Sequence, residues 1–114
     1  MNQDQDLIHF DAFSVSLELI RCLKPLLGAI GKGNPELVKQ LRRAVDSIAL
    51  NVAEGRRRVG GHRSQLWRVA AGSNDEVRAC LHVAHAWGLL QQDALEQPLQ
   101  LTDRLGAMLY RMTH

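Results

Sequence analysis

The residues best suited to chemistry are polar side chains that recur three and four positions apart in the middle of the chain. Ser47, Asn51 and Glu54 form one such set, and Ser73 and Glu76 form a second. At this spacing, side chains share one face of a helix. A catalytic cluster would need a base beside a serine, but no His or Lys lies at a matching spacing. We therefore favour a polar seam, in which these groups hydrogen-bond between two packed helices and fix their register.

Arginines cluster after the first polar set, where the sequence reads AEGRRRVGGHR. Guanidinium groups bind phosphate in a bidentate manner, so this cluster is a candidate for contact with a nucleic-acid backbone. The chain has no zinc pattern, aromatic RNA-binding strand motif or recognition-helix motif, so we expect charge and shape to govern binding. The alternative is a solvated helix end. The candidate nucleic-acid-binding residues are Arg43, Arg56, Arg57, Arg58 and Arg63.

Three further features could have a functional role, but we prefer a structural interpretation of each. Trp67 could stack on a base, but apolar packing is the better interpretation of a tryptophan here. His82 and His85 lie three positions apart near Cys80 without a further ligand, so we predict no metal. The stretch GKGNP lacks the pattern of a phosphate-binding loop and is interpreted as a turn between helices. We expect no cofactor.

The composition indicates one globular domain over residues 1–114, because a chain of 114 residues can bury one core. Hydrophobic residues make up 46% but aromatic ones only 4%, which favours closely packed helices of Leu, Val, Ile and Ala. The net charge is +2, with an acidic N-terminus and a basic middle. Cys22 and Cys80 lie in apolar runs, so we expect them reduced and buried. We find no signal peptide and no membrane-spanning stretch, and predict a cytoplasmic protein.

Apolar residues at helical spacing predict four helices that position these side chains. The first runs from about Asp11 to about Ile30 with a kink at Pro25, and the second begins at Pro35, after Asn34 as N-cap, and ends between Gly55 and Val59. The third runs from about His62 to Gly88, and the fourth starts after Asp93, with Pro98 at a kink or a delayed start. For the third helix we predict an inner stripe of Leu66, Ala70, Ser73, Val77, Cys80, Leu81, Ala84 and Trp87.

No strand pattern appears and the connections are short, so we predict an all-α fold, an antiparallel up-and-down four-helix bundle. The third helix is apolar around much of its girth, which indicates contacts on more than one side. Our candidates for an oligomer interface are Leu50, Trp67, Val83 and His85.

Two motifs resemble the four helix bundle family associated with intervening sequences of bacterial 23S rRNA genes. They are Arg43-Ala44, Ser47, Asn51 and Ala53-Glu54-Gly55 on one helix, then Gly72-Ser73 and Glu76 on the next. The resemblance spans about residues 35–90. It implies an antiparallel four-helix bundle that assembles as a pentamer, and a distant relative is the nucleic-acid-binding accessory protein of diversity-generating retroelements.

Together these observations predict a non-enzymatic homo-oligomer that associates with RNA or DNA through an arginine-rich helix end. A ring of subunits would repeat the arginines and strengthen the local field. The alternative is a protein-protein adaptor with no nucleic-acid role, which would use Leu50 and the apolar flanks of the third helix for another protein.

Overall fold

The computed structural model describes residues 2–114, and every regular element in that range is helical. The prediction of an all-α fold is therefore confirmed. The elements are α1 (Gln3–Ile8), α2 (Asp11–Leu23), the 3₁₀ turn η1 (Lys24–Leu26), α3 (Leu27–Gly33), α4 (Pro35–Arg56), α5 (Gly60–Ala86) and α6 (Gln92–Thr113).

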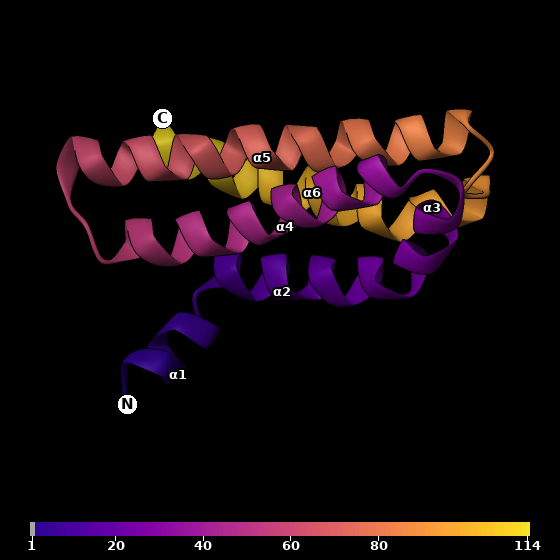
Figure 1. The fold of residues 1–114 in the computed structure, drawn as a ribbon. Helices are drawn as coiled ribbons and strands as arrows, with labels where there is room; N and C mark the ends of the chain where they lie inside the picture. Colours follow the sequence, from indigo (N-terminus) through magenta and orange to yellow (C-terminus); the bar gives the residue numbers. More distant parts are fainter. Residues whose placement is uncertain (1) are drawn as a thin grey trace.

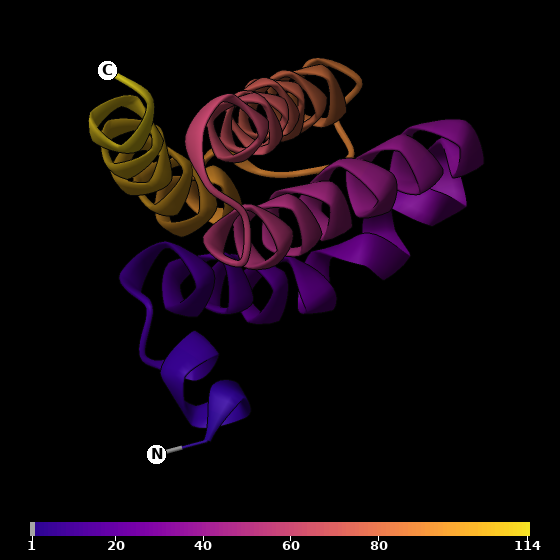
Figure 2. The ribbon, with the colours of Figure 1, turned by 90° about the vertical axis from the view of Figure 1, so that its left-hand side faces the viewer.

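Four long helices pack around one core (Figure 1). α4 contacts α5 most extensively and also packs on α2, while α6 packs on both α5 and α2. The short helix α3 lies against α4. Figure 2 shows α1 projecting away from these helices, joined to the start of α2.

The core is aliphatic, as the composition predicts. Burial of such side chains is the main favourable term in folding, at about 25 cal/mol per Å² of apolar surface. Side chains with no exposed surface come from all four long helices and include Leu19, Leu41, Ile48, Val52, Leu81, Leu105 and Leu109.

The first predicted helix is divided rather than merely kinked. Pro25 lies in η1, between α2 and α3, and α3 continues to Gly33 instead of ending near Ile30. Proline has no backbone N–H and its ring clashes with the carbonyl four residues earlier, so the α-helical pattern fails here. The chain passes this point with the tighter i→i+3 bonding of a 3₁₀ turn.

Pro98, in contrast, lies inside α6, which begins at Gln92 and continues to Thr113. The helix therefore starts slightly earlier than predicted, and the option of a delayed start after Pro98 is wrong. Pro98 is buried, and removal of its apolar ring from water counters the cost of the backbone hydrogen bond that the ring cannot donate.

The caps of α4 agree with the sequence. Asn34 Oδ1 accepts a hydrogen bond from the backbone N–H of Leu37 at 3.1 Å, and Pro35 is the first helical residue. α4 ends at Arg56, inside the predicted interval. This cap fixes where the helix that carries Ser47, Asn51 and the first arginines begins.

The inner stripe of α5 agrees with the prediction at five of eight positions, where Ala70, Val77, Cys80, Leu81 and Ala84 are buried, and differs at the other three. Trp67 and Asn74 are buried, whereas Leu66 and Ser73 are only half-buried and Trp87 is 71% exposed. α5 runs from Gly60 to Ala86, so Trp87 lies beyond its last turn rather than on its inner face. The helix is therefore rotated toward Trp67 and Asn74, whose side chains reach α4 and α6 respectively.

Candidate nucleic-acid interface

Three of the five residues predicted for the polar seam lie together between α4 and α5. The hydroxyl oxygens of Ser47 and Ser73 lie 2.8 Å apart, within hydrogen-bond distance. Asn51 Nδ2 donates to the backbone oxygen of Ser47 at 2.8 Å and to its Oγ at 3.1 Å. The contact between the two serines crosses from α4 to α5, whereas both Asn51 bonds lie within α4, and none of the groups they contact is a base.

The two glutamates assigned to the seam lie outside it. Glu54 is exposed and pairs with Arg58, which lies just beyond the end of α4, with 3.6 Å between the charged atoms. Glu76 is exposed on α5. Both carboxylates are therefore hydrated by solvent. Burial in the seam would require a compensating partner for each charge, and neither glutamate is buried there.

A second polar contact, which the sequence analysis missed, joins α5 to α6. Asn74 is 1% exposed, and its Nδ2 donates to the backbone oxygen of Thr102 at 2.9 Å. Its Oδ1 is the buried side-chain atom without a partner among the described residues. The available signal was its position seven residues after Trp67, which places the two on one stripe of α5.

Arg63 belongs to the interior scaffold rather than to a free basic surface. Its Nε donates to the backbone oxygen of Gly55 at 3.0 Å, and its Nη2 donates to that of Arg56 at 2.8 Å. Carbonyls in the last turn of a helix lack partners within the helix, so Arg63 of α5 caps the end of α4. These two hydrogen bonds occupy the Nε and Nη2 side of the guanidinium.

Two arginines and two aromatic rings form a stack beside this cap. The guanidinium carbon of Arg56 lies 4.7 Å from the ring centroid of Phe10, and that of Arg63 lies 5.1 Å from the Trp67 ring. The two rings stack on each other with 6.2 Å between centroids. Cation–π contacts of this kind contribute about 0.5–2 kcal/mol each.

Trp67 is buried, in agreement with the apolar-packing interpretation, and its selection as an oligomer-interface candidate is corrected because little of the ring is exposed. It is 8% exposed, and its Nε1 donates to the backbone oxygen of Val52 at 3.2 Å. The indole packs directly on Gly55, where an added Cβ would lie 2.4 Å from Nε1. A glycine on α4 thus makes room for the ring, which explains its burial.

The remaining predicted arginines are exposed. Arg58 pairs with Glu54, whereas Arg43 and Arg57 form no ion pair within 4.0 Å among residues 2–114. At 100° per residue, Lys39 and Arg43 share one outward stripe of α4, and Arg57, the C-cap of that helix, continues it. Leu50 lies on the same stripe and is 67% exposed.

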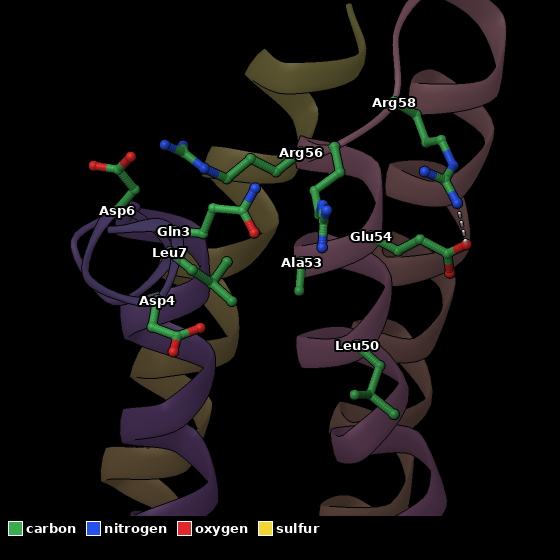
Figure 3. A pocket seen from close by; sticks show the side chains of 10 residues that line it. Gln3, Asp4, Asp6, Leu7, Leu50, Ala53, Glu54, Arg56 and Arg58 are labelled. Carbon is green, nitrogen blue, oxygen red and sulfur yellow. Dashed lines mark ion pairs between the residues drawn. The ribbon is translucent and has the colours of Figure 1, made fainter. Parts of the chain in front are cut away.

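A groove of roughly 630 Å³ separates the end of α4 from α1 (Figure 3). We call Arg56, Arg57 and Arg58 the arginine corner, and all three line this groove. The opposite wall is α1, which contributes acidic and polar side chains. The groove is lined by Gln3, Asp4, Asp6, Leu7, Leu50, Ala53, Glu54 and the arginine corner.

Of the other interface candidates, Val83 is 42% exposed on α5 and His85 is half-buried. Val69 on α5 and Trp87, just beyond the end of that helix, are further exposed apolar residues. Trp87 was predicted on the inner stripe of α5, and its exposure shows that this prediction is wrong.

The cysteines form no disulfide, and burial raises the pKa of both thiols. For Cys80 the Glu76 carboxylate raises the pKa further, because a nearby negative charge opposes thiolate formation. Cys80 is buried as predicted, whereas Cys22 is only half-buried.

In residues 2–114 no three His, Cys, Asp or Glu side chains are grouped to hold a metal ion. None of the described helices is long and apolar enough to cross a membrane.

Comparison with known proteins connects this fold to one family. A search of curated proteins finds no match. The sequence model of the family described as 23S rRNA-intervening sequence protein matches residues 12–111, a range that includes both the seam and the arginine corner. That description refers to 23S rRNA and names no enzymatic activity. Since the match covers most of the chain, the protein belongs to the 23S rRNA-intervening sequence protein family.

Proposed function

We propose that the protein is a non-enzymatic, homo-oligomeric helical protein that binds RNA or DNA backbone through the outward side of α4. The observation that carries this proposal is the stripe of Arg43 and Arg57, exposed and free of ion pairs among residues 2–114. The RNA context of the family name agrees with it.

The arrangement of the four long helices supports the finer fold proposal. α4 and α5 are joined by residues 57–59, and α5 and α6 by residues 87–91, and both pairs pack side by side. Connections this short favour antiparallel neighbours. We therefore propose one antiparallel up-and-down four-helix bundle as the single domain of residues 1–114.

Self-assembly would turn a weak field into a strong one. The net charge of a single chain is only +2, and a phosphate backbone is bound through many contacts at once. A pentamer, as the family resemblance implies, repeats Arg43 and Arg57 around its symmetry axis. Leu50 and Val83, both exposed, are the proposed apolar contacts between subunits.

The three residues of the arginine corner differ in the contacts that each must give up to bind phosphate. Arg57 is exposed without an ion pair among the described residues, Arg58 must leave Glu54, and Arg56 must leave the Phe10 ring. Arg63 would have to release two backbone oxygens of α4. We therefore propose Arg43 and Arg57 as the main phosphate contacts and Arg58 as a secondary one.

The test is binding of a fluorescent RNA hairpin and a DNA duplex by anisotropy over a range of salt, with light scattering to measure mass. Arg43→Gln/Arg57→Gln should weaken binding and reduce the salt slope by about 1.4–1.8 per subunit engaged. Arg21→Gln/Arg111→Gln removes the same charge from exposed sites on α2 and α6 and is the matched control. Equal losses in both variants would show that net charge, not the α4 stripe, governs binding.

A protein-protein adaptor is the second candidate, and the exposure of Val69, Val83 and Trp87 favours it. Apolar side chains grouped at one surface commonly mark a contact with another protein. A monomer that binds neither nucleic acid at low salt would reject the first proposal in favour of this one.

A further inference from the structure

The short helix α1 is attached to the rest of the molecule by little apolar burial. None of its residues is buried, Leu7 is half-buried and Ile8 is 52% exposed. Its N-terminus is capped locally, since Asn2 Oδ1 accepts a hydrogen bond from the backbone N–H of Gln5 at 2.8 Å. The position of α1 therefore depends on more than hydrophobic contact.

The two walls of the groove between α1 and the end of α4 carry mainly opposite charges. Asp4 and Asp6 belong to one wall of the groove, and the arginine corner belongs to the other (Figure 3). Asp11, just after α1, lies with Asp6 and Arg56 around an adjoining hollow. Residues 2–18 contain four Asp and Glu residues, one histidine, His9, and no Lys or Arg, so the segment that opposes the corner is predominantly acidic.

These carboxylates remain exposed and form no ion pair with the corner within 4.0 Å among residues 2–114. They act on it through their field, whose range is about 8 Å at physiological ionic strength and about 10 Å at 0.1 M salt. Among the described residues, the side-chain interactions of the arginine corner are the ion pair of Arg58 with Glu54 and the contact of Arg56 with the Phe10 ring, so the carboxylates of α1 leave its donors unpaired. A phosphate that enters the groove meets both signs of charge.

We propose that α1 is a built-in acidic competitor for phosphate at the arginine corner. A polyanion binds there only by displacing α1 or by overcoming its repulsion, so affinity is held below what the arginines alone would give. The identity of that polyanion as RNA rests on the proposed function, but the competition itself does not. Any extended chain of phosphates experiences the same opposing charge.

The test uses the full chain and inorganic tripolyphosphate, with binding followed by calorimetry at about 50 mM salt. Asp4→Asn/Asp6→Asn should bind roughly three- to tenfold more tightly than the wild type, and the gain should vanish as salt shortens the range of the field. Asp75→Asn/Glu96→Gln makes the same charge change at exposed sites on α5 and α6, outside the groove, and should change affinity less than about 1.5-fold.

Asp4→Glu/Asp6→Glu separates charge from helix fraying, because it keeps both carboxylates. Wild-type affinity in this variant supports the proposal, whereas affinity as tight as that of the asparagine variant overturns it. Equal gains in the two neutralised variants also overturn it, as does failure of all proteins to bind tripolyphosphate.

An RNA arm distinguishes this inference from the proposed function. If the asparagine variant gains tripolyphosphate affinity while neither it nor the wild type binds RNA, the competitor stands and the proposed function fails. If the wild type binds RNA and the asparagine variant gains nothing for either ligand, the proposed function stands and the competitor fails.

Discussion

Gly55→Ala tests whether the indole of Trp67 depends on the absence of a side chain on α4. An alanine Cβ would lie 2.4 Å from Trp67 Nε1 and 2.5 Å from Cδ1, so the ring must move by about an ångström. Movement weakens the hydrogen bond to Val52, worth about 1 kcal/mol, and overpacks a site where such strain costs about 1–3 kcal/mol. Alanine returns about 1 kcal/mol of helix propensity.

The free energy of unfolding should therefore fall by about 1–3 kcal/mol, which corresponds to a Tm lower by roughly 4–13 °C. Urea unfolding followed by circular dichroism measures the change. In a Trp87→Phe background, Trp67 is the remaining tryptophan and its emission reports on the ring itself.

Gly72→Ala is the matched control, because nothing lies within 4 Å of the added Cβ on the exposed side of α5. It should stabilise the protein by about 0.5–1 kcal/mol. If Gly55→Ala stabilises as much as Gly72→Ala, the close packing of Trp67 on α4 is refuted. If its cost persists in a Trp67→Leu background, the ring is not the cause.

Three further perturbations address the seam, the cap and the thiols. Asn51→Leu removes the donor that joins the amide to Ser47 and should lower the free energy of unfolding by about 1–2 kcal/mol or change the oligomeric mass, so unchanged Tm and mass would count against the seam. Arg63→Gln uncaps α4 and should destabilise by about 1–3 kcal/mol in urea unfolding, more than the exposed Arg21→Gln, and equal effects would contradict the cap. The raised pKa values keep both thiols protonated in the native state, so the unfolded chain ionises first and native stability falls as pH rises above about 8.5. Cys22→Ser/Cys80→Ala should flatten that fall in pH-dependent unfolding, and an unchanged profile would remove the thiols as its cause.

The aliphatic periodicity and the Asn34-Pro35 start predicted the helical class and the beginning of α4, because both are local signals. Proline was harder. Pro25 divides a helix and Pro98 does not, although both interrupt an apolar run, because the outcome depends on what each ring packs against. Pro25 is exposed, whereas Pro98 is buried.

In the candidate site, too, features set by local helical spacing could be predicted, whereas features set by tertiary packing could not. Ser47, Asn51 and Ser73 share faces that helical spacing can identify, and they lie together. The engagement of Arg56 and Arg63 could not be read from the sequence, because it depends on Phe10 and on the end of α4, which only tertiary packing brings near. α1 was missed since six residues with no buried face leave no apolar period.

The stack of Arg56, Phe10, Trp67 and Arg63 has a consequence for how relatives of this protein can diverge. Each guanidinium has an aromatic ring as its neighbour, and each ring has the other ring. Replacing Phe10 with an aliphatic residue leaves Arg56 as a solvated charge, and losing Trp67 removes the need for Gly55. Substitutions at these positions should therefore occur in pairs, so that covariation between the start of α2 and the end of α4 records a contact that neither segment reveals alone.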